Sequence, residues 1–417
     1  MNKKSVFDTK YIFVVVFSIG QIIFGLTQNS IYEILTGMVS IITQPSSLVT
    51  DYIGLGNMGA AFVNSGLVTL ICILLLYKLK QSLNGPFIAA IFTISGFALF
   101  GKNLFNVWFV LLGAYAYSRF KKDKFNKFLI PALFGTAIAP AVSEIAFGNT
   151  LPLTISLPLG MICGILLGFV IPPLGSSLIN VHHGFNLYNI GFTAGMTGLI
   201  FVSIIRSFGY VPTSQFIWTS GNNVTLGIYI FGLFGIILIT GFLLNGKSFK
   251  NYKNLLDYSG RLITDFVQLE GFPVSLINIG VTGIISTMYI LLINGDLNGP
   301  TIGGIFTIAG FSAFGKHPKN ILPVFLGVFI GSLLKVFAIN DPAIQLAALF
   351  GTALAPIAGE YGWHWGVVAG FVHSSVVLNV GYLHGGLNLY NNGFAAGLAA
   401  AVLIPIIEMF GKDDDSK

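Results

Sequence analysis

The side chains best suited to do chemistry in this chain are polar residues that occur twice, once in each half of the sequence. They sit inside apolar segments, where polar groups are costly and tend to line solute pathways. The most polar set comprises His182 with His384, Asn186 with Asn388, Tyr188 with Tyr390 and Asn189 with Asn391. Asn and Tyr both donate and accept hydrogen bonds, which suits a neutral polar solute or a desolvated ion. The same groups can instead join neighbouring helices, and both interpretations stay open.

A second pair consists of carboxylates. Glu144 and Glu360 each lie four residues after a proline, Pro140 or Pro356, in an apolar run. Proline breaks a helix and leaves backbone carbonyls that need other partners. We therefore predict that these carboxylates couple transport to protons or cations. The alternative is a carboxylate in the headgroup region or one neutralised by a neighbour.

A third pair opens two short apolar segments, Asn84-Gly85-Pro86 and Asn298-Gly299-Pro300. Asn caps helices well and Pro suits the first helical turn, so one interpretation is a helix start at the membrane surface. Only about 15 residues separate each proline from a later Gly-Lys, which is short for a crossing of about 20 residues. The other interpretation is therefore a half-spanning helix whose positive end faces solute. Lys102 and Lys316 then act as surface anchors or as attractive charges at opposite pore mouths.

Two further pairs lie before and within the second apolar run of each half. Asn64 and Asn278 lie deep in that run, and we predict that they face the pathway. For Asp51 and Asp265 we predict helix caps at the surface.

The composition excludes most other classes of protein. Of 417 residues, 54% are hydrophobic and 9% are charged, whereas a soluble domain has roughly 25% charged residues. Neither a soluble enzyme nor a nucleic-acid-binding protein fits this balance. No nucleotide-binding loop, metal-ligand spacing or nucleophile motif is present, so the sequence predicts no catalytic residues, cofactor or metal. Apolar runs of spanning length recur at Tyr11–Leu26, Gly59–Tyr77, Leu151–Val170, Thr225–Leu244 and Gly386–Ile407.

The chain is duplicated internally. Residues 83–102 and 297–316 are identical at 14 of 20 positions, 133–144 and 349–360 at 8 of 12, and 182–195 and 384–397 at 10 of 14. The three blocks keep their order, and the same offset places the run 225–244 opposite the first apolar run. The first run is therefore part of the fold and not a cleaved signal peptide.

Loop charges predict that the two halves have opposite orientations. Lys and Arg are concentrated at 119–127 in the first half and at 247–261 in the second, whereas the equivalent loops are nearly free of them. Basic residues mark cytoplasmic loops, so this reversal is typical of inverted repeats, each with an odd number of spans. We predict a first membrane repeat at 10–208, an outer connector at 209–224, a second repeat at 225–410 and a tail at 411–417. Both termini are expected in the cytoplasm.

The repeated blocks LNGPxIxxIFTIxGFxxFGK and HxGxNLYNxGFxAG resemble a bacterial family of multi-pass proteins catalogued as domain of unknown function 1576, over nearly the whole chain. That resemblance implies membership but no activity. A looser similarity is to urea transporters, whose inverted halves also carry an Asn-Pro opening to a short helix and a later Gly-Tyr-Asn-Gly-like segment. The additional Pro-Glu block, the histidines and the longer repeat depart from that pattern.

The sequence thus predicts an all-α integral membrane protein of the bacterial inner membrane, built from two inverted repeats of five to seven segments each, with short or broken helices. The first hypothesis is a transporter of a small polar or ionic solute that is not an enzyme. The alternatives are a passive channel for a small neutral solute and a membrane enzyme acting on a lipid-linked substrate with His and Glu as acid and base. The expected partners are the solute and the lipid bilayer, and a homo-oligomer stays open.

Overall fold

The computed structural model describes residues 9–148, 151–213 and 215–411. Every regular element in this part of the chain is a helix, and its only β contact is an isolated bridge between Thr50 and Ile217. Nine of its helices are long and apolar enough to cross a membrane, and a tenth span results if the bent pair Phe125–Ile138 and Pro140–Phe147 counts as one. The prediction of an all-α membrane protein is confirmed.

The elements of the first half follow one another with short connections. They are α1 (Thr9–Gln28), α2 (Ile31–Thr43), α3 (Tyr52–Leu55), α4 (Met58–Lys78), α5 (Gly85–Phe97), α6 (Val107–Phe120), η1 (Phe125–Phe128), α7 (Leu129–Gly135), η2 (Thr136–Ile138), α8 (Pro140–Phe147), α9 (Leu153–Leu178), η3 (Ile179–Val181) and α10 (Asn189–Ser207).

The second half repeats this order closely. Its elements are α11 (Asn223–Leu244), α12 (Tyr252–Leu255), α13 (Phe266–Leu269), α14 (Phe272–Leu292), α15 (Gly299–Phe311), α16 (Pro318–Leu334), α17 (Pro342–Gly351), η4 (Thr352–Leu354), α18 (Ala355–Tyr361), α19 (Trp363–Val380), η5 (Gly381–His384) and α20 (Asn391–Gly411). The main departure is that the helix α2 has only the short α12 at the equivalent place.

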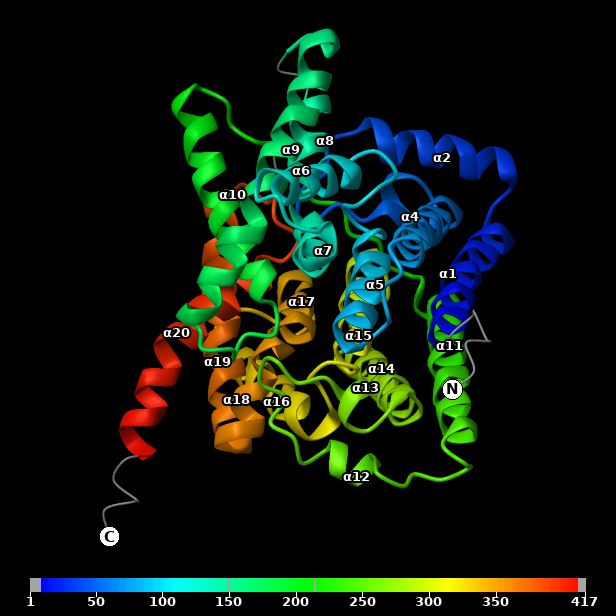
Figure 1. Ribbon diagram of the computed structural model, residues 1–417, viewed down its shortest axis with the longest axis vertical. Helices are drawn as coiled ribbons and strands as arrows, with labels where there is room; N and C mark the ends of the chain where they lie inside the picture. Colours follow the sequence, from blue (N-terminus) through cyan, green and yellow to red (C-terminus); the bar gives the residue numbers. More distant parts are fainter. Residues whose placement is uncertain (1–8, 149–150, 214, 412–417) are drawn as a thin grey trace.

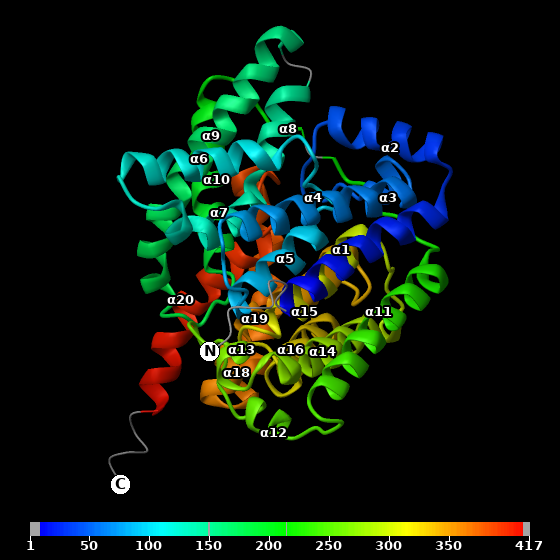
Figure 2. The ribbon, with the colours of Figure 1, turned by 45° about the vertical axis from the view of Figure 1, so that its right-hand side comes forward.

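Two half-length helices, α5 and α15, lie at the centre of the molecule (Figures 1 and 2). Each has 13 residues, all of them buried, and so is about 20 Å long, against about 30 Å for a hydrocarbon core. Each ends in a turn that needs glycine, because φ is +146° at Gly101 and +118° at Gly315. This turn explains the repeated Phe-Gly-Lys of the sequence.

The central helices pack against each other in antiparallel fashion. Gly96, near the end of α5, packs against Gly303, near the start of α15. A Cβ added at Gly96 would lie 2.7 Å from the Gly303 carbonyl oxygen, and one at Gly303 would lie 2.8 Å from that of Gly96. The start of α5 correspondingly meets the end of α15, since Gly85 abuts Ala313. Small residues therefore let the two backbones approach closely.

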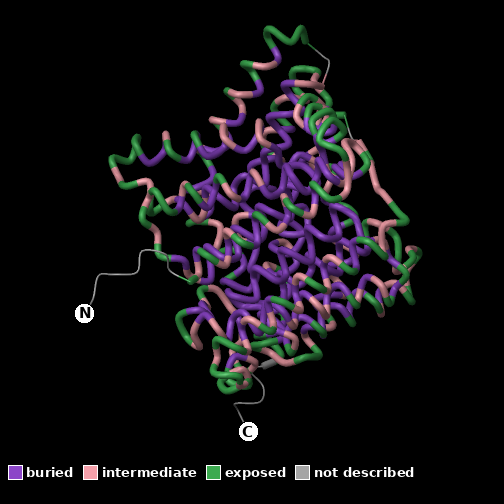
Figure 3. The backbone as a smooth tube through the Cα atoms, turned by 90° about the vertical axis from the view of Figure 1, so that its right-hand side faces the viewer, coloured by how far each residue is buried: buried purple, intermediate pink, exposed green. Residues whose placement is uncertain are grey.

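The longer helices surround this centre in equivalent pairs. Helix α1 packs on α4 and α11 on α14, while α6 packs on α9 and α16 on α19. Helices α10 and α20 also contact each other across the halves (Figure 1). Buried backbone fills the middle of the molecule, and exposed segments lie at its rim (Figure 3). Many outward residues of these helices are apolar, as expected for surfaces that face lipid.

The segment between the halves packs back onto the molecule. The backbone N–H of Ile217 donates to the Val49 carbonyl at 2.9 Å, and the Asp51 N–H donates to the Ile217 carbonyl at 3.1 Å. The predicted connector 209–224 corresponds to the non-helical stretch between α10 and α11. Most of the predicted tail 411–417 lies outside the described residues.

The sequence predictions of short and broken helices agree with these elements. A 42° bend separates Phe125–Ile138 from Pro140–Phe147, at the predicted proline break. At the equivalent place in the second half, the 3₁₀ turn η4 interrupts α17 and α18, although Pro342–Tyr361 is long and apolar enough to span as a unit. With the bent pair included, five candidate spans fall in each half, at the lower end of the predicted five to seven.

The close crossing of α5 and α15 predicts that Gly96→Ala destabilises the protein. The new methyl group meets the Gly303 backbone, and such overpacking costs about 1–3 kcal/mol. In Gly232→Ala the methyl group on α11 has no atom within 4 Å, so this control keeps the helix-propensity gain of about 1 kcal/mol. Thermal unfolding in detergent should give a lower midpoint for Gly96→Ala and an equal or higher one for Gly232→Ala. Equal midpoints would contradict the close crossing.

Candidate functional site

The start of each half-length helix is bound by an aspartate from the opposite half. Asp265 Oδ1 accepts the Gly85 N–H at 3.1 Å, and Asp51 Oδ1 accepts the Gly299 N–H at 3.2 Å. Both aspartates also cap a short helix of their own half, through the N–H of Ile53 at 3.0 Å or Gln268 at 3.1 Å. The predicted caps are confirmed, but their predicted surface location is wrong, because both side chains are buried.

Asn84 and Asn298 cap the same two helices from within their own half. Asn84 Oδ1 accepts the Phe87 N–H and Asn298 Oδ1 accepts the Thr301 N–H, each at 3.1 Å. The Asn298 side chain also donates to the Thr219 carbonyl of the connector at 3.0 Å. These contacts match the cap interpretation, while the short buried helices match the half-spanning one. A pathway role for either asparagine stays a prediction.

Asn64 and Asn278 bind the other ends of the half-length helices. Asn64 Nδ2 donates to the carbonyls of Ala98 at 2.7 Å and Lys102 at 2.9 Å. Asn278 Nδ2 donates to those of Ser312 and Lys316, both at 2.7 Å. Carbonyls at a helix end otherwise lack partners, so these deep asparagines stabilise the helix ends, and their pathway role stays a prediction.

The loops that follow α9 and α19 cross to the opposite half. The Leu187 N–H donates to the Ala353 carbonyl and the Leu389 N–H to the Ala137 carbonyl, each at 3.0 Å. The side chains of Asn186 and Asn388 extend this exchange, donating to the carbonyls of Gly393 at 2.9 Å and Gly191 at 3.2 Å respectively. The Oδ1 atoms of Asn186 and Asn388 accept hydrogen bonds from the backbone N–H of Tyr188 and Tyr390 respectively, each at 3.0 Å.

This exchange brings the two repeated tyrosines together at the seam between the halves. The ring centroids of Tyr188 and Tyr390 are 4.9 Å apart. Each ring also contacts a phenylalanine at the end of a half-length helix, with centroid distances of 4.6 Å from Phe97 to Tyr390 and 4.8 Å from Phe311 to Tyr188. Edge-to-face contacts of this kind stabilise aromatic clusters.

The repeated histidines lie beside the seam and bind the repeated asparagines. His182 Nε2 is 3.0 Å from Asn189 Oδ1, and His384 Nε2 is 3.0 Å from Asn391 Oδ1. Each asparagine also donates to α9 or α19, at the Gly175 or Val377 carbonyl. The predicted i,i+4 faces of His182/Asn186 and His384/Asn388 are absent, because the chain between each histidine and its asparagine is a turn and not an α-helix. The side-chain partner of each histidine is seven residues away.

A cavity of about 440 Å³ leads from the surface to the seam. Its mouth includes the exposed residues Lys127, Ser176 and Ile263, and its floor includes the buried Tyr188 and Tyr390. Most of its wall is apolar, from residues such as Ile130, Pro131, Phe134, Pro172, Phe311 and Phe314. Volumes of 300–1,000 Å³ are typical of small-molecule sites. Of the predicted pathway residues, Tyr188, Asn189 and Tyr390 line this cavity.

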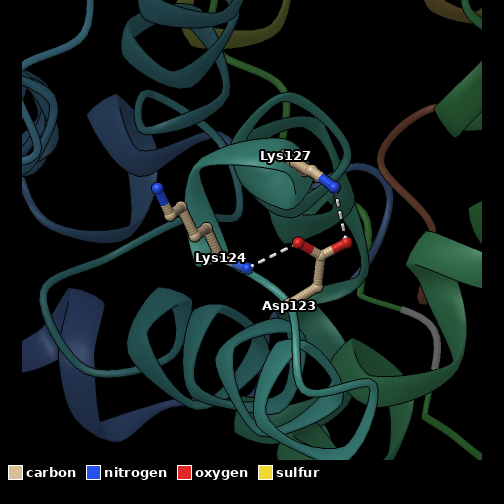
Figure 4. A network of polar contacts seen from close by, with 3 residues as sticks. All are labelled: Asp123, Lys124 and Lys127. Carbon is tan, nitrogen blue, oxygen red and sulfur yellow. Dashed lines mark hydrogen bonds and ion pairs between the residues drawn. The ribbon is translucent and has the colours of Figure 1, made fainter.

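The lysine at the mouth is held by an ion pair. Asp123 accepts a hydrogen bond from Lys127 Nζ and one from the Lys124 N–H, each at 2.8 Å (Figure 4). The hydrogen bond from Lys127 lowers the pKa of the Asp123 carboxyl, so this carboxylate is charged at neutral pH. Because the pair is exposed, it contributes little to stability.

The repeated glutamates lie in different surroundings. Glu144 is buried under the connector, where its Oε1 accepts the Thr213 N–H at 2.7 Å and the Thr213 hydroxyl at 2.9 Å. Its Oε2 is buried and has no hydrogen-bond partner in the described part of the chain. Glu360 is exposed on α18. Because α8 and α18 lie far apart in both ribbon views (Figures 1 and 2), the two carboxylates do not form one site.

Lys102 and Lys316 contradict both sequence interpretations, since neither is a surface anchor or lies at a pore mouth. Both side chains are fully buried, each directly after the glycine turn that ends a half-length helix. Lys316 Nζ donates to the Tyr188 hydroxyl and, at 2.7 Å, to the Thr352 hydroxyl. The sequence shows the duplicated Gly-Lys, but it does not show that Lys316 contacts Tyr188, which lies 128 residues away.

One buried polar contact has no counterpart in the other half. His373 Nε2 lies 3.0 Å from Asn392 Oδ1, and both residues are buried. The equivalent position of the first half is Ile171, so His373 is not part of the duplicated set. No group of three or more potential metal ligands occurs in residues 9–148, 151–213 and 215–411.

A second cavity, of about 560 Å³ between α1 and α11, has no charged residue in its lining.

Because Asp51 caps the half-length helix of the opposite half, we predict that Asp51→Asn lowers the free energy of unfolding. Asp51 accepts hydrogen bonds from Ile53, Gly299 and Thr219, and an amide would direct its own N–H groups at some of these donors. Leaving such buried groups unsatisfied costs about 1–3 kcal/mol. The measurement is the free energy of unfolding in a denaturing detergent titration.

The matched control for this variant is Asp257→Asn. Asp257 is exposed and pairs with Lys319 at 3.0 Å, and exposed pairs contribute little. We expect no change in unfolding free energy for the control. A similar result for Asp51→Asn would mean that the cap from the opposite half does not stabilise the half-length helix.

Comparisons with known proteins give a family but no activity. No curated protein and no solved structure matches this chain, so the looser resemblance to urea transporters stays a prediction. A family model described as a protein of unknown function, DUF1576, matches residues 30–207 and 226–409. These segments coincide with the two halves of the fold and together cover most of the sequence. The chain therefore belongs to the DUF1576 family.

Proposed function

We propose that this protein moves a small solute across a lipid bilayer through the seam between its halves. The observation that carries the proposal is the cavity of about 440 Å³ that ends at Tyr188 and Tyr390, beside the crossing of two half-length helices. Irregular backbone and short helices inside a membrane protein are tolerated where they are buried in protein or line a cavity. Solute sites of transporters built from repeats commonly lie at the repeat interface near such helices.

The arrangement of the halves supports opposite membrane orientations. Each half has five candidate spans when the bent pair is counted as one. Because five is odd, the second half would begin on the opposite side of the membrane and so be inverted relative to the first. The antiparallel crossing of α5 and α15 and the reversed loop charges agree with this topology. The same rule puts the basic loop 119–127, and therefore the mouth beside Lys127, on the cytoplasmic side together with both termini.

The contrast between equivalent regions favours a transporter over a passive channel. Where the first half has the cavity wall, with Pro172 and Ile190, the second half has Ser374 and Asn392. There, Lys335 Nζ donates to Ser374 Oγ at 2.8 Å, and His373 binds Asn392. The first half thus has a cavity at the seam, while hydrogen bonds within the second half take its place at the equivalent position, a difference that fits one of the two states of alternating access.

The cavity predicts that a blocking group at its mouth stops flux. Ser176 is exposed and lines the cavity, whereas the exposed neighbour Ser177 does not. In a Cys163→Ala background, which leaves only the buried Cys72, Ser176→Cys should lose most of its flux after treatment with a methanethiosulfonate reagent. Ser177→Cys is the matched control and should retain it.

The assay is stopped-flow light scattering on proteoliposomes with acetamide, glycerol, acetate and benzoate as probes. Flux that survives labelling of Ser176→Cys would place the pathway elsewhere. No flux of any probe above empty liposomes would overturn the proposal of transport for solutes of this size.

Because Glu144 is buried and Glu360 is exposed, we predict that replacing each by glutamine affects proton-coupled flux differently. Glutamine imitates a protonated carboxyl group, and only Glu144 is buried with an unpartnered oxygen. If protons drive transport, Glu144→Gln should lose the dependence of flux on an imposed pH gradient, while Glu360→Gln, at an exposed site, keeps it. Gradient-dependent flux in Glu144→Gln would rule out coupling through this residue. Wild-type flux without gradient dependence would favour the passive channel.

A further inference from the structure

The two buried lysines occupy equivalent places at the seam. Lys102 and Lys316 each follow a half-length helix and have no exposed side-chain surface. Lys102 Nζ lies 5.0 Å from the centroid of Phe97, and Lys316 Nζ lies 4.4 Å from that of Tyr188. Both therefore contact the aromatic cluster, one from each half.

Neither ammonium group has a carboxylate partner in the described part of the chain. The ion pairs found there join Lys127 to Asp123 and Lys319 to Asp257, all on the surface. Lys316 donates only to two uncharged hydroxyls, and Lys102 Nζ has no hydrogen-bond partner. Burying a charge without a counterion costs several kcal/mol, and contacts with aromatic faces offset only part of that cost.

The cavity gives an external anion a route to one of these charges. Lys316 Nζ binds the hydroxyl of Tyr188 and lies 5.4 Å from the ring of Phe311, and both rings form part of the cavity lining. The ammonium therefore lies directly behind the inner end of the cavity. Toward the mouth the wall is apolar and aromatic, and Lys127 is at the rim. This arrangement matches a molecule with one negative charge and an apolar body.

We propose that the seam binds a small organic anion, whose charge is balanced by Lys316 when the cavity is open on the Lys127 side. This inference rests on the proposed transport function and names its substrate class. By the equivalence of the halves, Lys102 balances the same anion when the opposite side is open. Consistent with a closed opposite side, the Tyr390 hydroxyl binds Thr93 at 3.2 Å and not Lys102.

The first test is binding of benzoate and of its neutral counterpart benzamide to the purified full-length protein, by isothermal titration calorimetry. The two probes have nearly the same shape, so a difference in affinity reports the charge. We expect benzoate to bind at least about tenfold more tightly than benzamide, since a charge-assisted contact contributes 1.4 kcal/mol or more. Equal affinities, or no binding of benzoate, would overturn the inference without any mutation.

The second test compares Lys316→Met with Lys319→Met. Methionine keeps much of the lysine volume, and replacing a buried charge by an apolar group is often neutral or stabilising. Lys319 is exposed three residues along the same segment. We expect benzoate affinity to fall about tenfold or more in Lys316→Met and to stay unchanged in Lys319→Met, with benzamide binding unaffected in both. Equal benzoate affinity in the two variants would contradict the role of Lys316.

Flux measurements separate a failure of this inference from a failure of transport. Flux of acetamide or glycerol that labelling of Ser176→Cys blocks, without benzoate binding, would overturn the anion site and leave transport standing. Benzoate binding without flux of any probe would overturn transport and leave an anion-binding site. If both hold, Lys102→Met should reduce benzoate flux, because the second lysine serves the opposite state.

Discussion

The structure depends on one constraint, which is that a helix ending inside a membrane protein must find partners for its free backbone groups. The ends of α5 and α15 leave N–H and C=O groups where no water can satisfy them. Asparagine caps and aspartates supply acceptors at their starts, and Asn64 and Asn278 supply donors at their ends. The repeated asparagines and aspartates at these helix ends therefore each bind a specific backbone group. Removing one would leave a buried polar group unpaired, which costs more than an ordinary hydrogen bond contributes.

This constraint also makes the two halves interdependent. The aspartate that completes one half-length helix comes from the other half, and the loops 182–189 and 384–391 exchange backbone hydrogen bonds across the seam. The close approach of the helices at Gly96 and Gly303 adds contacts that no single half could make. A half expressed alone would expose these groups, so the duplicated unit is a folding partner for its copy and not an independent domain. The place where the halves meet is consequently a region whose polar groups are held by partners from both halves.

The sequence predicted the elements better than it predicted their contacts. Hydrophobic length and proline placement identified the spans, the broken segment at Pro140 and the short helices after Asn84 and Asn298, because each is a local property of the chain. The sequence could not predict that each aspartate caps a helix of the other half, because the two partners are more than 100 residues apart. It could not predict that Lys102 and Lys316 are buried, because their burial depends on the packing around the helix ends. For the same reason the asparagines looked like pathway residues. Duplication showed that they matter, but only their partners show that they bind backbone carbonyls.

The two halves share a scaffold but differ in the chemistry at their equivalent positions. Glu144 is buried beneath the connector 209–224, where it binds Thr213, while Glu360 is exposed on α18. Likewise, Ile171 and Pro172 are replaced by His373 and Ser374, so an apolar wall in one half corresponds to a hydrogen-bonded region in the other. The residues that satisfy helix ends or form the aromatic seam are the same in both halves, whereas the walls on either side of the seam differ. An energetic difference between two states of the protein can arise in these walls without disturbing the shared centre.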